Sequence, residues 1–176
     1  MMGHFAVEML GKMAEKGNLE AMFYLGLVYL SDSLGTKNLV EAVKWFQKGA
    51  DQGHAKGQLG MANCYFFGLG VPQDKAEGIK WYQKAADQGL DIAQYNLGNA
   101  YFSGEGCLEN KAKAVKWFQK AADQGYASAQ FRLGLIYYYG QGAPLNKAKG
   151  LTLIQKAADK NDEEAINFLR EVSKSF

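Results

Sequence analysis

Proline, cysteine and histidine are scarce in this sequence, with only two of each in 176 residues. Two cysteines are too few for a disulfide framework or a thiolate metal site. The near absence of proline excludes a collagen-like chain. The 20 basic and 18 acidic residues almost balance, which gives no electrostatic reason to expect a nucleic-acid partner. No apolar run approaches the ~18 residues that a membrane-spanning helix requires.

Glycine, in contrast, is abundant, with 21 residues, or about 12% of the chain, against roughly 7% in ordinary proteins. Apolar residues make up 48% of the sequence, aromatic residues make up 13%, and the net charge is only +2. This composition excludes a disordered chain and predicts one that buries a real core. The glycines therefore require an architectural explanation, and internal repetition is the first one to test.

The three tryptophans, Trp45, Trp81 and Trp117, are spaced by 36 residues. The sequence around this position recurs as AVKWFQKGADQG, GIKWYQKAADQG, AVKWFQKAADQG and GLTLIQKAADKN. A second block lies upstream of each copy and recurs as AMFYLGLVYL, GQLGMANCYF, AQYNLGNAYF and AQFRLGLIYY. The register holds without a gap from Met9 to Leu169, so the chain is almost five periods of one repeat.

The sequence pattern of each repeat predicts two helices, which we call its first and second helix. Apolar residues of the first helix recur at i, i+4, i+7 and i+8, as they do from Ala93, and the second helix has a similar stripe. Glycines break the chain between the two, and Asp74 or Asn110 stands where an N-cap is required. One such pair cannot bury both of its faces, so neighbouring pairs must stack. We expect second helices near 4–16, 39–51, 75–87, 111–123 and 147–159, and first helices near 19–31, 55–67, 91–103, 127–139 and 163–172.

The repeated unit A-x-Q-Y-x-L-G-x-x-Y-x-x-G-x-G, followed by K-A-x-x-W-[FY]-x-K-A-A-x-x-G, resembles the Sel1-like repeat, a relative of the tetratricopeptide repeats. The resemblance implies an all-α fold, a right-handed α/α superhelical solenoid of about five 36-residue helix-turn-helix repeats. The first full repeat departs from the pattern, since Asp32 and Leu34 replace loop glycines and Gly35 lies one residue later. We predict a single domain with a half repeat at 1–17, repeats at 18–53, 54–89, 90–125 and 126–161, and a C-terminal capping helix at 162–176.

Residues that recur in every repeat are predicted to be packing residues. The row Gly26, Ala62, Gly98 and Gly134 is expected to let two helices approach closely, and the tryptophans are expected to pack between adjacent repeats. Lysines recur along the second helices. We expect a solvated outer face whose lysine stems cover apolar surface, with an acidic partner as the alternative. These lysines are Lys44, Lys48, Lys80, Lys84, Lys116 and Lys120.

Catalytic motifs are absent. Some relatives of the Sel1-like family are described as penicillin-binding or β-lactamase-like, but the chain has no S-x-x-K, S-D-N or K-T-G. It also lacks H-E-x-x-H, a P-loop and paired CxxC motifs. His54 falls in a turn and is expected to be solvated, Cys64 is expected in the core, and Cys107 falls in a loop at a different repeat position, so we expect no disulfide. The prediction is a protein without enzyme activity, cofactor or metal, with a cell-wall-related or β-lactamase-like hydrolase as the alternative.

The resemblance also implies that the first helices line the concave side of the solenoid. Their positions off the core stripe are rich in aromatic residues and almost uncharged, which predicts a groove for a peptide or protein segment. The alternative is that several of these residues are buried between neighbouring helices. The predicted groove residues are Phe23, Leu27, Leu59, Asn63, Phe66, Tyr95, Asn96, Asn99, Phe102, Phe131, Arg132, Leu135 and Tyr138.

The polar members of this set are the more informative ones. Asn63 and Asn99 lie one repeat apart, as do Asn96 and Arg132, and an Asn amide can both donate to and accept from an extended peptide backbone. Peptide-clamping tetratricopeptide domains use a similar Asn, Asn and Arg arrangement, and Asn63, Asn96 and Arg132 match those places. The two clamp lysines are missing, so the resemblance implies backbone binding rather than specificity for a terminal carboxylate.

The two ends of the sequence differ. The last helix is highly charged, which is typical of a solenoid cap. Met9 aligns with Trp45, so the chain begins in the second half of a repeat, either as a natural cap or as a cut from a longer protein. A cut would leave an apolar end face that favours self-association. MMGHFAVEML does not resemble a signal peptide, so the compartment is cytoplasmic as the sequence stands, or periplasmic or secreted if an upstream signal was removed. The expected partner is a protein or peptide, without nucleic acid or membrane insertion.

Overall fold

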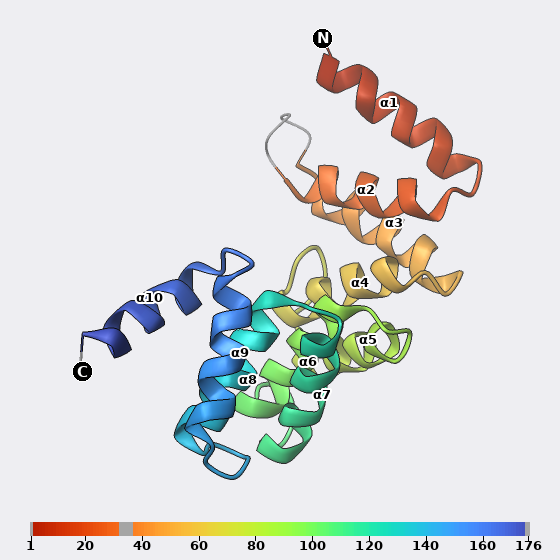
Figure 1. Cartoon of the computed structure of the whole chain (residues 1–176). Helices are drawn as coiled ribbons and strands as arrows, with labels where there is room; N and C mark the ends of the chain where they lie inside the picture. Colours follow the sequence, from red (N-terminus) through yellow and green to blue (C-terminus); the bar gives the residue numbers. More distant parts are fainter. Residues whose placement is uncertain (1, 32–36, 175–176) are drawn as a thin grey trace. The chain divides into compact units, whose positions relative to one another are not determined.

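The computed structural model describes residues 2–31 and 37–174, without the side chains of residues 2–4 and 6. This described part contains ten helices and no strand, as the sequence predicts (Figure 1). Each predicted helix is present, with ends within two residues of the prediction. The unusual loop with Asp32, Leu34 and Gly35 lies outside the described residues. The helices are α1 (Met2–Glu15), α2 (Leu19–Leu30), α3 (Leu39–Asp51), α4 (Ala55–Phe67), α5 (Lys75–Asp87), α6 (Asp91–Ser103), α7 (Lys111–Asp123), α8 (Ala127–Tyr139), α9 (Lys147–Ala158) and α10 (Glu163–Ser173).

The chain forms two compact units, Met1–Leu90 with α1–α5 and Asp91–Phe176 with α6–α10. Within each unit, every helix packs against the next one in sequence (Figure 1). First helices (α2, α4, α6, α8, α10) therefore alternate with second helices (α1, α3, α5, α7, α9). No helix within residues 2–31 and 37–174 is both long and apolar enough to cross a membrane.

The loop before a second helix is closed by the same pair of hydrogen bonds in four repeats. The N-cap side chain accepts from the backbone N–H three residues later, at 2.9 to 3.1 Å. The backbone N–H of the cap donates to the carbonyl of the tyrosine nine residues earlier, at 2.7 to 2.9 Å. Both hydrogen bonds satisfy backbone groups that have no partner within the helix at its end. The predicted capping role of these residues is confirmed. The caps are Asn38, Asp74, Asn110 and Asn146.

Small residues make room for a neighbouring helix in two ways. A Cβ atom added to Gly98 would lie 2.7 Å from the ring of Phe118, so this glycine accommodates an aromatic ring rather than a second backbone. At Gly150 the backbones themselves meet, since an added Cβ would lie 2.7 Å from the carbonyl oxygen of Gly134. The predicted close approach of two helix backbones therefore occurs between α8 and α9.

The repeated tryptophans and lysines form stacked pairs. Trp81 packs partly against a cluster built from Phe46 of the preceding repeat and Cys64 of its own, which confirms its predicted place between adjacent repeats. A lysine ammonium group lies above each indole, 3.8 to 4.2 Å from the ring centroid. The lysine stems thus cover apolar surface on the outer face, as predicted. The pairs are Lys48–Trp45, Lys84–Trp81 and Lys120–Trp117.

A row of buried glutamines on the first helices bonds to the end of the second helix of the same repeat, and no sequence-based prediction covers it. Gln88 follows the last turn of α5 and donates from Nε2 to Oε1 of Gln58 at 2.8 Å, and the corresponding pair in the second unit lies at 2.9 Å. Gln130 differs, because Lys160 stands where the other repeats have glutamine and donates instead to the carbonyl of Gly125. Oε1 of Gln130 is therefore buried without a partner among the described residues.

Candidate functional site

Three of the predicted groove residues, Leu59, Phe66 and Phe131, are buried. The ring of Phe66 packs against Tyr82, with centroids 5.7 Å apart, and that of Phe131 packs against Phe168 at 6.3 Å. These side chains belong to the core, so the expectation of an open aromatic stripe is wrong at these positions. The physical reason is that another helix packs over this side of the first helices. The ring of Phe66 on α4 is covered by α5, and the ring of Phe131 on α8 is covered by α10.

The other predicted groove residues remain at least partly accessible. Leu27 and Arg132 are exposed, and eight residues are half-buried: Phe23, Asn63, Tyr95, Asn96, Asn99, Phe102, Leu135 and Tyr138. Asn96 and Arg132 occupy the same repeat position on successive first helices of the second unit, α6 and α8. Asn63 and Asn99 belong to different compact units, so their predicted ladder stays a prediction.

The two asparagines have different surroundings. The hydroxyl of Tyr82 donates to Oδ1 of Asn63 at 2.5 Å, which occupies an acceptor that a peptide backbone would need. The equivalent of Tyr82 in the next repeat is Phe118, which has no hydroxyl. The side-chain amide of Asn99 makes no hydrogen bond to any residue that the structure describes. Asn99 is therefore the better placed of the two to bind a partner.

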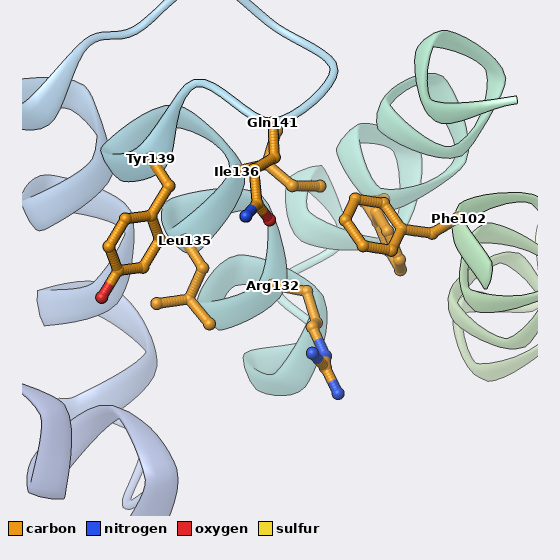
Figure 2. A pocket seen from close by; sticks show the side chains of 7 residues that line it. Phe102, Arg132, Leu135, Ile136, Tyr139 and Gln141 are labelled. Carbon is orange, nitrogen blue, oxygen red and sulfur yellow. The ribbon is translucent and has the colours of Figure 1, made fainter.

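A pocket of about 150 Å³ opens between α6, α7 and α8 of the second unit (Figure 2). Figure 2 shows the ring of Phe102 facing Ile136 across the pocket, while the guanidinium group of Arg132 extends away from the apolar side chains. Three of the predicted groove residues meet here, Phe102, Arg132 and Leu135. The complete lining is Phe102, Phe118, Arg132, Leu135, Ile136, Tyr139 and Gln141.

The size and lining of this pocket limit what it can hold. Sites for drug-sized molecules and cofactors measure about 300–1,000 Å³, whereas an apolar cavity of about 150 Å³ holds a single benzene-sized group. The pocket therefore fits one apolar side chain. Arg132 is exposed and has no carboxylate within ion-pair distance in the described ranges, so its five N–H donors are available at the same place. Together they can receive an apolar side chain and bind a nearby carbonyl or carboxylate.

His54 lies in the turn before α4, as the sequence predicts, but its exposure differs from the prediction. We expected it to be solvated, but its side chain is only 15% exposed, because it caps α4 and packs against Gly49. Its Nε2 lies 3.4 Å from a carboxylate oxygen of Glu20, and Nδ1 is buried without a partner among the described residues. A hydrogen bond from Lys56 is the main cause that lowers the pKa of Glu20. The side chain of His4 lies outside the described part.

The cysteines and other metal-binding side chains form no reactive centre in the described ranges. Cys64 is buried, as predicted, and burial raises the pKa of its thiol to about 11. Burial also raises the pKa of Cys107, which is half-buried, and both cysteines are free. No group of three or more His, Cys, Asp and Glu side chains that could hold a metal ion occurs among the described residues.

The N-terminal helix exposes an apolar face. Phe5, Met9 and Met13 lie four residues apart on α1, and each is exposed. Met9 occupies the repeat position of the tryptophans. Self-association through this face stays a prediction.

Comparisons with known proteins identify the repeat. The model of the Sel1 repeat matches residues 19–54, 55–90, 91–126 and 127–162. A protective antigen of uropathogenic Escherichia coli strains, whose crystal structure displays an SLR fold, is 38% identical with a TM-score of 0.86 over 93% of this chain and 35% of that chain. A Sel1 repeat protein from Oxalobacter formigenes is 36% identical with a TM-score of 0.83 over 95% of this chain and 49% of that chain.

More distant structures share the same architecture. An immunity protein from Pseudomonas aeruginosa is 25% identical with a TM-score of 0.65 over 92% of this chain and 59% of that chain. The chain thus spans about a third to a half of the length of the E. coli and O. formigenes proteins. Among curated proteins, none matches the sequence.

Proposed function

The chain belongs to the Sel1 repeat family, and we propose that it is a non-catalytic scaffold that binds a segment of a partner protein on the surface of α6 and α8. Sel1 repeat proteins are typically protein-interaction scaffolds. The observation that carries the proposal is the pocket lined by Phe102 and Leu135, which is large enough for one apolar side chain and has Arg132 beside it.

The proposed mode of binding combines one anchor with polar contacts. A leucine or phenylalanine of the partner enters the pocket, and full burial of such a side chain stabilises a complex by ~1.5–3 kcal/mol. Arg132 donates to a carbonyl or carboxylate of the same segment. Asn99 lies one turn before Phe102 on α6, and its amide supplies further contacts to the partner backbone. The anchor selects the side chain, and the polar groups orient the segment.

The proposal of a non-catalytic role is supported by the surroundings of the nucleophile and base candidates. Nucleophilic catalysis requires a nucleophile within hydrogen-bond reach of a base. The Cys64 thiol is buried with a pKa of about 11, and His54 lies against Glu20 rather than against a hydroxyl or thiol. The serine and lysine motifs of β-lactamases are also absent.

The experiment is a selection of displayed peptides against the full chain, followed by fluorescence anisotropy of the selected peptide with variants. Leu135→Asp places a charge in the pocket lining and should weaken binding at least about tenfold, and Arg132→Gln should weaken it several-fold. Leu27 occupies the same repeat position in the first unit and is exposed, so Leu27→Asp is the matched control.

The outcomes separate clearly. The proposal predicts that Leu27→Asp binds the peptide as the wild type does and that all three variants keep the wild-type circular dichroism spectrum. Equal affinities of Leu135→Asp and wild-type protein would show that the pocket is not the binding site.

A further inference from the structure

The second unit carries another binding surface on its second-helix side. Side chains of α7 and its N-cap surround a hollow of about 440 Å³, which we call the lysine pocket. Its lining residues are Asn110, Ala112, Lys113, Lys116, Trp117 and Lys120. We propose that the lysine pocket binds an acidic segment of a partner protein, one in which Asp or Glu residues alternate with other residues. This site is independent of the pocket between α6 and α8.

The charges in the lysine pocket are not neutralised as they are in the first unit. In α3, Lys44 pairs with Glu41 at 2.6 Å, and in α5, Lys80 pairs with Glu77 at 2.8 Å. In α7, a lysine, Lys113, takes the position of these glutamates. The sequence from 110 to 122 contains no acidic residue. The outer face of this repeat therefore has a positive charge where two equivalent faces have ion pairs.

Lys113 is the residue that changes the charge of this face. It stands where the two preceding repeats have Glu41 and Glu77, so Lys116 lacks the partner that Lys44 and Lys80 have. Neither of these two lysines, nor Lys120, has a carboxylate within ion-pair distance among the residues that the structure describes. Three exposed ammonium groups on one helix face thus stay without a counter-charge.

Aromatic rings hold two of the three ammonium groups in place. Nζ of Lys113 donates to the hydroxyl of Tyr101 at 2.6 Å and lies 4.1 Å from the centre of its ring. Nζ of Lys120 lies 4.0 Å from the centre of the Trp117 ring. These contacts orient the lysine side chains without neutralising their charge. Binding of a carboxylate therefore costs less conformational entropy of the lysines.

The spacing of the ammonium groups matches an extended acidic segment. The three lysines occupy positions i, i+3 and i+7 of α7, which spread over about 10 Å along the helix axis at ~1.5 Å per residue. Side chains on one face of an extended chain recur at about 6.6 Å, since each residue advances ~3.3 Å. Two carboxylates at alternate positions therefore reach two or three of these ammonium groups at once.

The aromatic residue in the lysine pocket favours a protein partner over a membrane or a nucleic acid. Membrane interfaces take up exposed tryptophan, and single-stranded nucleic acids stack their bases on open aromatic faces. Trp117 is only 7% exposed, and Lys120 covers the face of its ring. It therefore serves as the floor of the site and not as a stacking platform.

The test uses the full chain and a fluorescein-labelled decapeptide of alternating glutamate and serine, at about 20 mM salt, where surface charges are weakly screened. Lys113→Glu recreates the glutamate–lysine pair of α3 and α5, so the variant should fold as the wild type does. We expect it to bind the peptide at least about tenfold more weakly. Lys44→Gln removes a lysine that already has a partner and should bind within about twofold of the wild type.

A second measurement locates the bound peptide. The chain has three tryptophans, so a nuclear magnetic resonance spectrum resolves three indole N–H signals. The peptide should shift the signal of Trp117 and leave those of Trp45 and Trp81 in place. Leu135→Asp should not change the affinity for this peptide, which separates the lysine pocket from the pocket of the proposed function.

Four results would overturn the proposal. The first is no binding of the peptide by the wild-type chain, and the second is undiminished binding by Lys113→Glu. The third is equal affinity for a decapeptide of alternating glutamine and serine. The fourth is tighter, Lys113-dependent binding of a single-stranded DNA oligonucleotide or of phosphatidylserine vesicles, which would assign the site to a different class of partner.

Discussion

The hydroxyl of Tyr82 on α5 donates a hydrogen bond to Oδ1 of Asn63 on α4, with 2.5 Å between the two oxygen atoms. The bond joins the two helices of one repeat. In the preceding repeat, the same two positions hold Leu27 and Phe46, neither of which has a polar side-chain group. These two positions of the repeat thus accept either a polar pair or an apolar pair of side chains.

Tyr82→Phe should lower the free energy of unfolding by about 1 kcal/mol, because it leaves Oδ1 of Asn63 without its donor in a half-buried place. The double variant Asn63→Leu with Tyr82→Phe copies Leu27 and Phe46 and should recover most of this loss. Urea unfolding of the wild type, both single variants and the double variant measures the coupling. Strictly additive effects of the two substitutions would contradict a direct interaction.

Lys160→Gln should raise the free energy of unfolding by about 1 kcal/mol, because a glutamine there can donate to the buried Oε1 of Gln130. Gln88 shows the geometry, since its Nε2 donates both to Oε1 of Gln58 at 2.8 Å and to the carbonyl of Gly53 at 2.9 Å. Lys160→Ala is the control and should be less stable than the wild type. Thermal unfolding that ranks the glutamine variant no higher than the alanine variant would contradict this account of the glutamine row.

The contribution of Glu20 to stability should depend on pH in the acidic range. The hydrogen bond from Lys56, with a smaller contribution from His54, lowers the folded-state pKa of Glu20 below its ordinary value of 4.5. The stabilisation is therefore present above about pH 4.5 and is lost as the pH falls through the folded-state pKa. The Glu20 side chain is 51% exposed, so solvent screening limits the effect to ~0.2–1 kcal/mol.

Urea unfolding of Glu20→Gln measures this dependence. The variant should be less stable than the wild type at neutral pH and equally stable at about pH 2, where the carboxyl is protonated in both states. A stability difference that stays constant between these two pH values would show that the charge of Glu20 does not contribute.

The two thiols should react at very different rates. Burial raises the pKa of Cys64 to about 11 and removes its sulfur from solvent, whereas Cys107 is half-buried in a loop. With a thiol reagent at about pH 8, Cys107 should be modified at least about tenfold faster, because the thiolate is the reactive form. In denaturant both should react at similar rates. Mass spectrometry of partly modified protein identifies the site, and equal rates in the native state would contradict the burial of Cys64.

The period of 36 residues explains why so much of the fold could be predicted from the sequence. A residue that recurs at the same place in successive copies has the same structural role, which locates the helices, the N-caps such as Asn110 and the outer-face lysines whose stems cover apolar surface. The two helices of a repeat follow from local patterns of apolar residues and glycine, which do not depend on distant contacts.

The burial of individual side chains could not be predicted in the same way. A helical projection assigns Phe131 to a face of α8, but its burial depends on Phe168 of α10, which packs over that face. The solvation expected for His54 failed for the same reason, because Gly49 lets the preceding helix come close to it. The glutamine row recurs in three repeats, as the tryptophans do, and the signal for it was a glutamine at a position where the first full repeat has Met22.

The central claim is that the pocket between α6 and α8 binds a partner segment, and its most direct test is a nuclear magnetic resonance titration of the full chain with the selected peptide. The account predicts that backbone amide shifts concentrate at Phe102, Arg132, Leu135 and Tyr139, and that Leu135→Asp abolishes them at the same peptide concentration. Shifts that lie away from α6 and α8, or that persist in Leu135→Asp, would contradict it.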